Sequence, residues 1–474
     1  MNNTCFSKSY NENLLLMDEV LGAEECFDIL RKDLVFGERR ARVYCVDGFC
    51  KDDTVLKMLT SCMELPKGSL ESYKSIREFS HRHIGYIEAD ATNELSKAVA
   101  MVLAGPVLLF VEGFDECLII DTREYHTRGI SEPDSDRSLR GAREGFNETL
   151  IVNTSMIRRN IRTPHLRTEH FSVGKVSKTD VVMMFIKDKA DIRKVQRLKY
   201  RLNNLDVNSL TMKQESLAEA LVNKGWYNPF PKVRYTERPD CAAACLNEGG
   251  IVIVTDGTPA VMLLPTALID FFQDSNDYYF PPLVGSYLRI MRFIIYMLTL
   301  FLIPTWYLFI LNPDIVPRWL DFVMIEKMNK VPVFCQLMLV ELVITCLKEA
   351  SLNTPSSLGS SFSVVAGLLL GDFAVKARWF VPEVLLYMAF VAVANFAQPS
   401  YELGYAVKLC RILLIVMTGL FNIWGYVTAC VIILLLIATA PTLTGQSYLY
   451  PIIPFDGKKL KRALLRVRMD NENS

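Results

Sequence analysis

The amino-acid sequence predicts an α/β cytoplasmic region of two similar subdomains, followed by an α-helical multi-pass membrane domain. The mean hydropathy of the 474-residue chain is +0.21, although 22% of its residues are charged. This combination is too hydrophobic for an ordinary soluble protein and too charged for one that lies wholly within a membrane. Charges are frequent before residue 285 and isolated within the apolar stretch 286–440. We therefore expect the first part to lie in water and the second to span a membrane.

These changes in composition divide the chain into four expected parts. Its first residues are polar and acidic and lack the pattern of a signal peptide, so we expect the long N-terminal part to stay in the cytoplasm. The expected parts are an N-terminal α/β subdomain (1–140), a second α/β subdomain (141–284), a polytopic transmembrane domain (285–440) and a basic cytoplasmic tail (441–474).

Three stretches of the first part share one local pattern, an apolar run that reaches an acidic residue followed by glycine. They are ARVYCVDGF (41–49), VLLFVEGFDECLIID (107–121) and IVIVTDGTPAVMLL (251–264). In the last two the apolar run resumes after the turn, which is typical of a β-hairpin, because glycine readily adopts the positive φ of a tight turn. A further strand is expected at 178–188. The recurrence of this pattern in both halves predicts the two subdomains.

Helices are expected between these strands, where four segments have helical patterns: DDTVLKMLTSCMEL, FNETLIVNTSMIRRNIR, KADIRKVQRLKYRLNNL and SLAEALVNKGW. The apolar run 98–113 is not expected to be a membrane helix. It is too short to cross, and Gly105 and Pro106 interrupt it.

The stretch RGAREGFNETLIVNTSMIRRNIRTP (140–164) contains five arginines. Four of its apolar residues recur at intervals of four, seven and four, which predicts one face of a helix within 146–162: Phe146, Leu150, Ile157 and Ile161. Arginines in the last turn stabilise the negative end of the helix dipole. The proline that follows ends the helix, because it disfavours α geometry in the residue before it.

From Arg158 to Arg201 the chain has thirteen Lys or Arg against four Asp or Glu. Three interpretations of this excess stay open: binding to nucleic acid, contact with anionic lipid, and contact with the acidic surface of a neighbouring subunit. The segment lacks the interleaved aromatic residues of single-strand binding, and a membrane domain follows it. Contact with a subunit or with lipid is therefore favoured over nucleic acid.

Five apolar blocks make up the expected membrane domain: 286–311, 331–347, 358–375, 379–396 and 408–440. The last block is long enough to be either one tilted helix or two segments broken around Asn422 to Gly425. The basic tail that follows predicts a cytoplasmic C-terminus. Because both termini are then inside, the number of crossings must be even, so either one block is re-entrant or the last block is double.

The third block has one helical face made only of small residues, at intervals of four, three, four and four: Ser356, Ser360, Ser363, Gly367 and Gly371. Small residues allow close helix packing in lipid. They also suit the wall of a pore, where they leave room for water and where hydroxyls solvate a passing ion. Spacing alone leaves both interpretations open.

Isolated acids within the apolar blocks are unfavourable in hydrocarbon unless they face a polar interior or find partners. Asp372 has Lys376 four residues further on, which suits a helical ion pair. Glu341 and Glu349 have no such neighbour in the sequence, so we expect these two acids to form a cation path.

No catalytic constellation is present. The GxxxxGK[ST], GxGxxG, HExxH and CxxC motifs do not occur in the sequence. We therefore expect no enzymatic activity, no cofactor and no metal site.

The motifs RGAREGF (140–146), NTSMIRRNIRTP, DGTP (256–259) and TALIDFFQDSNDYY (266–279) occur in this order. Together they resemble the motifs of the GerA spore germination family, whose A-type subunits have a cytoplasmic N-terminal region and a C-terminal membrane domain. The resemblance covers most of the chain. One departure is Ala142, which stands where the family motif usually has the proline of Arg-Gly-Pro-Arg.

The resemblance implies a homo-oligomeric, pentameric channel in the inner membrane of a bacterial spore, which releases monovalent cations and amplifies nutrient-receptor signalling. Implied partners are membrane lipid, a small membrane protein and germinant receptor complexes, without nucleic acid. It implies that one group of residues couples domains and subunits: Arg140, Gly141, Arg143, Glu144, Arg158, Arg159 and Arg162. It also implies a turn motif of Asp256, Gly257, Thr258 and Pro259. Two alternatives stay open: a non-conducting scaffold that clusters receptors, and the A subunit of a nutrient receptor.

Overall fold

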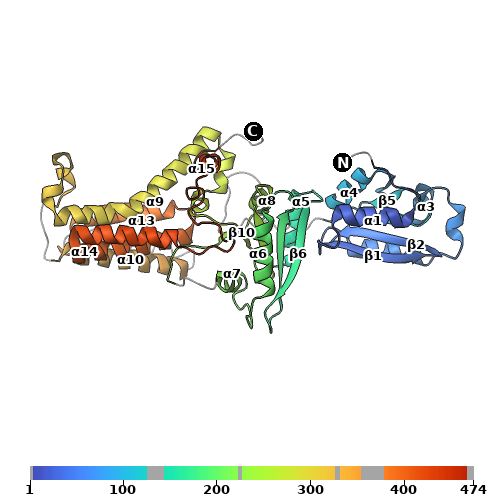
Figure 1. The fold of residues 1–474 in the computed structure, drawn as a ribbon, viewed down its shortest axis with the longest axis horizontal. Helices are drawn as coiled ribbons and strands as arrows, with labels where there is room; N and C mark the ends of the chain where they lie inside the picture. The colour runs from blue at the N-terminus through green and yellow to red at the C-terminus, as the bar shows by residue number, and fades with distance from the viewer. Residues whose placement is uncertain (1–3, 125–142, 223–226, 326–330, 354–377, 467–474) are drawn as a thin grey trace. The chain divides into compact units, whose positions relative to one another are not determined.

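The computed structural model describes residues 4–124, 143–222, 227–325, 331–353 and 378–466 (Figure 1). The chain forms two compact units, which we call the α/β unit and the helical unit. The α/β unit comprises Met1–Asn223, Val233–Thr266 and Leu443–Gly445. The helical unit comprises Lys224–Lys232, Ala267–Thr442 and Gln446–Ser474.

The α/β unit contains two five-stranded antiparallel sheets with the same topology. The first has the order β1-β2-β4-β5-β3 and consists of β1 (Ile29–Phe36), β2 (Arg39–Val46), β3 (Ala89–Thr92), β4 (Val107–Val111) and β5 (Cys117–Ile120). The second has the order β6-β7-β9-β10-β8 and consists of β6 (Leu166–Val173), β7 (Thr179–Ile186), β8 (Arg234–Thr236), β9 (Ile251–Thr255) and β10 (Val261–Leu264). Numbered from the first strand of each sheet, both orders are 1-2-4-5-3.

The helices also occur at matching places between the strands (Figure 1). The first subdomain has α1 (Tyr10–Leu21), α2 (Asp52–Met63), α3 (Ile76–His83) and α4 (Leu95–Ala104). The second has α5 (Leu150–Asn160), α6 (Ile192–Asn203), α7 (Gln214–Val222) and α8 (Pro239–Asn247). The first subdomain adds a single 3₁₀ turn, η1 (Ser69–Ser72). The prediction of two similar α/β subdomains is confirmed.

Both faces of each sheet are covered, which explains the continuous apolar runs in the sequence. Successive residues of a strand point to opposite faces. On β4, Leu108 and Phe110 pack in the core under α1 and α4, whereas Val107 and Leu109 pack in the core that includes α3. Every residue of β4 is buried for this reason.

The expected hairpins are present as the antiparallel pairs β4–β5 and β9–β10. The strand expected at 178–188 is β7. The run 98–113 is divided between the end of α4 and β4, and Gly105 ends the helix with a φ of 115°. This run therefore does not form a single membrane helix.

The arginine-rich helix is shorter than predicted, because α5 begins at Leu150 rather than near Phe146. Asn153 explains the difference. Its Oδ1 accepts a hydrogen bond from the Asn147 backbone N–H at 2.8 Å, and its Nδ2 donates to the Asn147 carbonyl at 2.6 Å. These two bonds occupy the backbone of Asn147, which would otherwise join the first helical turn.

The helical unit contains α9 (Pro282–Leu311), α10 (Val333–Asn353), α13 (Pro382–Phe396), α14 (Tyr401–Ala438) and α15 (Gly457–Leu464). Short 3₁₀ turns, η2 (Leu268–Phe272), η3 (Ser275–Tyr279), η4 (Pro313–Ile315) and η5 (Arg318–Val323), flank α9. Among the described residues, α9 and α14 are long and apolar enough to cross a membrane. The expected third block, 358–375, lies outside the described residues.

The chain reverses direction within α14. Asn422 has a φ of 53° and a ψ of −133°, which is not helical. In a straight helix Met417 and Gly425 would lie about 12 Å apart. Instead, a Cβ on Gly425 would overlap the carbonyl oxygen of Met417. The last apolar block therefore consists of two helical segments, which is one of the two alternatives that the sequence left open.

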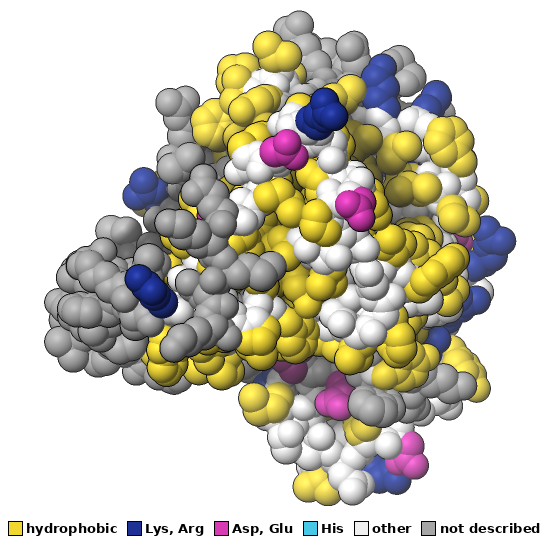
Figure 2. Space-filling view, turned by 90° about the vertical axis from the view of Figure 1, so that its left-hand side faces the viewer, with side chains coloured by type: hydrophobic (Ala, Val, Ile, Leu, Met, Phe, Trp, Pro, Cys, Tyr) yellow, Lys and Arg dark blue, Asp and Glu magenta, His cyan; other side chains and the backbone are white. Residues whose placement is uncertain are grey.

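The outer surface of the helical unit is strongly apolar. In Figure 2 hydrophobic side chains spread over much of the coloured surface, and only a few charged side chains lie among them. Large exposed residues come from several helices, including Leu386, Phe396, Leu420, Trp424 and Leu434. Exposed apolar surface on this scale is typical of a membrane or protein interface.

Candidate functional site

Two stripes of polar residues, one on α10 and one on α14, face each other within the helical unit, and we call them together the polar seam. On α10 the stripe follows helical spacing, and α14 carries a matching stripe. The seam consists of Glu341, Thr345, Lys348 and Glu349 on α10, with Tyr401, Tyr405, Lys408 and Arg411 on α14. Glu341 and Glu349, the two acids expected to form a cation path, thus lie on the same face of α10.

The inner end of the polar seam is a buried ion pair. Arg411 and Glu341 are 1% and 2% exposed, and Nη2 of Arg411 donates to Oε1 of Glu341 at 2.5 Å. Nη1 of Arg411 donates to the Thr299 carbonyl of α9 at 3.0 Å. Arg411 therefore joins α9, α10 and α14, and it supplies the partner that Glu341 lacks in the sequence.

Three polar atoms near this pair are buried without a hydrogen-bond partner among the described residues: Oε2 of Glu341, Nε of Arg411 and Oε1 of Gln398. The Nε2 of Gln398 donates to Oγ1 of Thr299 at 3.3 Å. A buried polar atom without a partner is unfavourable by about 1–3 kcal/mol. Among the described side chains, these three atoms therefore keep unused hydrogen-bonding capacity.

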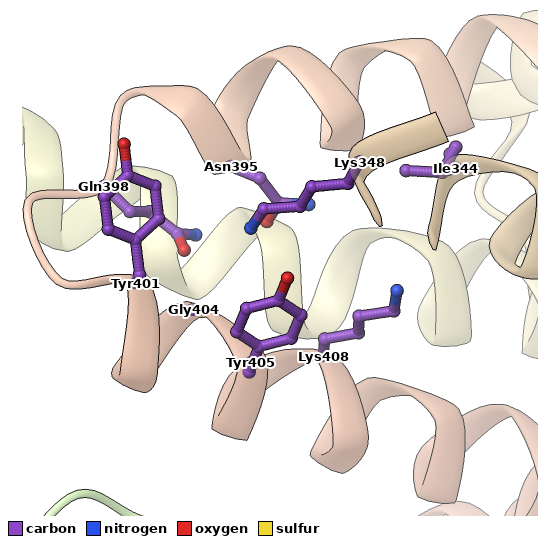
Figure 3. Close-up of a pocket in the computed structure, with 8 residues that line it drawn as sticks. All are labelled: Ile344, Lys348, Asn395, Gln398, Tyr401, Gly404, Tyr405 and Lys408. Carbon is purple, nitrogen blue, oxygen red and sulfur yellow. The ribbon is translucent and has the colours of Figure 1, made fainter. Parts of the chain in front are cut away.

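The outer end of the seam contains lysines and tyrosines that line a small cavity (Figure 3). Nζ of Lys348 lies 4.2 Å from the ring centre of Tyr405, whose hydroxyl donates to Glu349 at 3.5 Å. Nζ of Lys408 donates to the Thr345 hydroxyl. The cavity volume is ≈ 20 Å³, which holds about one water molecule.

A second buried ion pair joins the two α/β subdomains. Arg158 of α5 is completely buried, and its guanidinium donates two hydrogen bonds to Asp28, which precedes β1. The hydroxyl of Thr168 donates to the same carboxylate. The first subdomain therefore contributes an acid to a site that the second subdomain lines with a cation and a hydroxyl.

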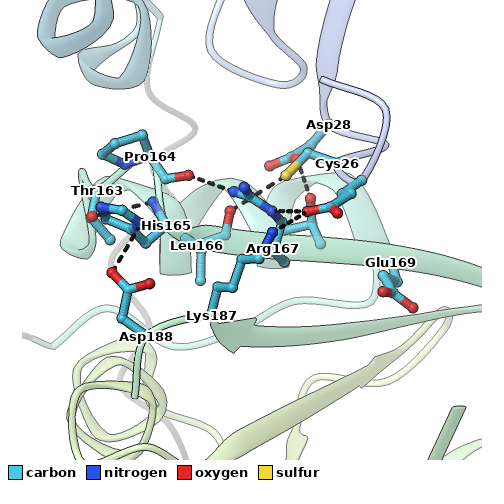
Figure 4. Close-up of polar contacts among 12 residues, drawn as sticks. Cys26, Asp28, Thr163, Pro164, His165, Leu166, Arg167, Glu169, Lys187 and Asp188 are labelled. Carbon is cyan, nitrogen blue, oxygen red and sulfur yellow. Dashed lines mark hydrogen bonds and ion pairs between the residues drawn. The ribbon is translucent and has the colours of Figure 1, made fainter. Parts of the chain in front are cut away.

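The segment that carries Asp28 also pairs with the edge of the second sheet. Cys26 forms a parallel bridge with Thr168 of β6, and the Phe27 N–H donates to the Thr168 carbonyl at 3.1 Å. Figure 4 shows Arg167 extending from β6 between Pro164 and this segment. Because β6 is an edge strand, the pairing also covers backbone groups that would otherwise be exposed.

Glu25 adds a pH-dependent contact to this boundary. The hydrogen bond that the Arg167 guanidinium donates to Glu25 lowers the pKa of that carboxyl below its usual value of 4.5. A carboxyl with a lowered folded-state pKa stabilises the fold above its unfolded pKa, and the contribution is lost as the pH falls through the folded pKa.

We expect Glu25→Gln to lower the stability of the full-length protein at pH 7 by about 0.5 kcal/mol, because Glu25 is half exposed. The difference from the wild type should shrink as the pH falls below 4.5. Thermal unfolding of both proteins from pH 7 to pH 3.5 measures it. A difference that stays constant over this range would show that the ion pair is not its source.

The DGTP turn, between β9 and β10, holds the start of α5. Oδ1 of Asp256 accepts a hydrogen bond from the Leu150 N–H at 3.3 Å, and the Gly257 N–H donates to the Glu148 carbonyl at 2.8 Å. Nδ2 of Asn153 donates to the Thr258 carbonyl at 3.3 Å. The turn thus fixes the helix that carries Arg158.

The structure places the predicted coupling residues in different environments. Arg158 forms hydrogen bonds with Asp28 of the first subdomain, whereas Arg159 pairs with Glu144 at 2.9 Å. Arg143 and Arg162 are exposed. Arg140, Gly141 and all five predicted pore-lining residues lie outside the described residues, so their roles stay predictions: Ser356, Ser360, Ser363, Gly367 and Gly371.

Sequence reasoning missed the partners of Arg158 and Arg411. Asp28 is 130 residues from Arg158, and Glu341 is 70 residues from Arg411. No local spacing predicts such pairs. The one signal for Arg411 was its position inside an apolar block, where a cation needs a partner. Among the described residues, no group of three or more His, Cys, Asp or Glu side chains could hold a metal ion.

Comparison with known proteins assigns a family to this two-part architecture. The family model for the Bacillus/Clostridium GerA spore germination protein matches residues 17–474. The chain belongs to the GerA family. Stage V sporulation protein AF of Bacillus subtilis (strain 168) is 34% identical over 446 residues, which cover 94% of this chain and 90% of that protein. The resemblance expected from the sequence is confirmed.

Two further matches have lower sequence identity. Spore germination protein KA of Bacillus subtilis (strain 168) is 28% identical over 97% of this chain and 85% of that protein. Among solved structures, the N-terminal domain of the A subunit of the Bacillus megaterium spore germinant receptor GerK3 is 26% identical, with a TM-score of 0.43. The match covers 56% of this chain and 97% of that domain. Membership of this family supports a role in spore germination.

Proposed function

We propose that this GerA-family protein is the subunit of a pentameric channel in the spore inner membrane, which releases monovalent cations during germination and amplifies the signal of nutrient receptors. Both termini then face the spore core. The reversal at Asn422 supports this topology, because a double last block and the four earlier blocks give six crossings, an even number.

The observation that carries the proposal is the polar seam. Ionisable groups inside an apolar helical unit are unfavourable in a membrane, and they are typical of ion pathways. The seam brings two acids and three cations together on two helices, and Arg411 and Glu341 form a buried ion pair at its inner end. A unit that only packed in lipid would need none of these groups.

The charges of the polar seam determine which of its two acids can attract a cation. Because Arg411 neutralises Glu341, this acid alone does not attract a cation in the arrangement that the structure shows. Glu349, at the exposed end, remains the better candidate for the entrance of a cation path. We place the narrow part of the pore at the small-residue face that contains Ser363 and Gly367, on the spacing of that face.

We expect Gly367→Trp to abolish cation flux through the purified full-length oligomer in liposomes, because an indole would fill the pore. Gly85→Trp is the matched control, since a Cβ at Gly85 meets nothing within 4 Å. Flux of K⁺ from loaded vesicles measures the effect, and size-exclusion chromatography checks assembly. If both assembled variants passed K⁺ equally fast, the third block would not line the pore.

The same measurement tests the non-conducting alternatives. If the wild type passes no ion under any condition while it assembles, the protein is a scaffold that clusters germination receptors, or it needs a partner subunit. Repeating the flux measurement with a co-purified membrane partner separates these two cases. A nutrient that gates the flux would instead favour the A subunit of a nutrient receptor.

A further inference from the structure

A basic helix and an exposed apolar loop lie together near the end of the described chain. α15 has four cations in eight residues and no acid: Lys458, Lys459, Lys461 and Arg462. The loop before it exposes three large apolar side chains, with Ile452, Ile453 and Phe455 at 53%, 58% and 76%. We call these two elements the basic anchor.

The basic anchor is fixed to the start of α9. Nη1 of Arg289 donates to the Arg462 carbonyl at 2.9 Å and to the Ala463 carbonyl at 3.4 Å, so it caps the last turn of α15. The Arg466 N–H donates to the Ser286 hydroxyl at 3.0 Å. Asp277, which is fully buried, holds Arg289 in place through a 3.2 Å hydrogen bond.

This attachment determines the position of the basic anchor relative to the membrane. α9 begins at Pro282 and is one of the two helices that are long and apolar enough to cross a membrane. Its first turns expose Leu283 and Tyr287, at 83% and 59%. If α9 spans the bilayer, its start lies at the headgroup level, and α15 lies beside it at the same level.

Asp456, the acid next to α15, offsets only one of the four positive charges of this helix and is held within the fold. Oδ1 of Asp456 accepts a hydrogen bond from the Lys459 N–H at 3.1 Å, and Oδ2 accepts one from the Tyr450 hydroxyl at 2.8 Å. Lys458 and Lys461 are exposed. The surface thus combines exposed cations with exposed apolar side chains, the composition of segments that insert shallowly into anionic membranes.

We propose that the basic anchor binds anionic phospholipid headgroups at the membrane surface, with Ile453 and Phe455 inserted between the acyl chains. This inference rests on the proposed membrane function. The lysines contact lipid phosphates, and the apolar loop enters the boundary between headgroups and acyl chains. Through Arg289, lipid binding then stabilises the junction between α15 and α9.

The test compares full-length protein in nanodiscs of phosphatidylcholine with protein in nanodiscs that also contain phosphatidylglycerol. Hydrogen exchange followed by mass spectrometry measures the protection of residues 457–464. We expect about tenfold slower exchange in the anionic nanodiscs, since each lysine near such a surface contributes about fivefold to binding. Raising the salt concentration to about 1 M shortens the Debye length to about 3 Å and should remove most of the difference.

Two variants identify the groups responsible. The triple variant Lys458→Gln, Lys459→Gln, Lys461→Gln should lose the response to phosphatidylglycerol. A matched variant with three exposed lysines of the α/β unit changed, Lys51→Gln, Lys57→Gln, Lys67→Gln, should keep it. Phe455→Ser should reduce the protection in both types of nanodisc, because it removes the apolar contact.

The outcomes separate this inference from the proposed function. If α9 and α14 are protected in both nanodiscs while 457–464 exchange equally fast, the protein is in the membrane and lipid binding by the basic anchor is wrong. If the lysine variant responds to phosphatidylglycerol like the wild type, these lysines are not the lipid-binding groups and the proposal is wrong. If α9 and α14 do not become protected in either nanodisc, the membrane assignment itself fails.

Discussion

Replacing Arg411 with methionine is expected to destabilise the helical unit by about 3–5 kcal/mol, because it leaves the Glu341 carboxylate buried without a cation. The change also removes the donor to the Thr299 carbonyl. For a unit of this size the loss corresponds to a fall of about 10 °C in the unfolding midpoint. Thermal unfolding of the purified full-length protein measures it. The control Arg318→Met removes an exposed cation and should change stability by less than about 0.5 kcal/mol.

The double variant Glu341→Leu, Arg411→Met separates packing from conduction. Replacing both members of a buried ion pair by apolar residues is often neutral or stabilising. We therefore expect the double variant to unfold close to the wild-type temperature. If it also passes cations at the wild-type rate in liposomes, the pair is structural only. If it assembles and no longer conducts, Glu341 or Arg411 belongs to the ion path.

Replacing Arg158 with methionine is expected to destabilise the α/β unit by a similar amount, about 3–5 kcal/mol. Asp28 would keep the Thr168 hydroxyl but lose both guanidinium bonds. Because this pair joins the two subdomains, we expect their contact to weaken before either sheet unfolds. Faster hydrogen exchange at Phe27, whose N–H donates to the Thr168 carbonyl, would report the opening.

The neighbouring arginine provides the control. Arg159→Met removes a pair with Glu144 in which both side chains are partly exposed, so a loss of only about 0.2–1 kcal/mol is expected. The two substitutions are chemically identical and lie on the same helix. If both variants lost the same stability, the effect would come from the helix itself and not from the contact between subdomains.

Much of the α/β fold was predictable because local patterns specify it. The DG and EG turns located two hairpins, and the apolar runs located their strands. The start of α5 was misplaced, since Asn153 binds the backbone of Asn147 and delays the helix. The spacing of the apolar residues is the same with or without such a contact, so it does not show where the helix begins.

The candidate site was predictable only in part. Glu341 stood out, because an acid in an apolar block requires a polar environment. Its partner did not, since Arg411 belongs to a separate block and reaches Glu341 only when α10 and α14 pack together. Periodicity describes one helix at a time, so it cannot show which two polar faces meet.

The sequence by itself determined the two-part architecture, the repeated α/β pattern and the family, because composition, turn chemistry and ordered motifs are local properties. Tertiary structure alone decided that the last block reverses at Asn422, that Arg411 neutralises Glu341, and that Arg158 reaches Asp28. The physical reason is the same in each case. A buried charge or a chain reversal is stabilised by groups distant in the sequence, and only the folded chain brings them together.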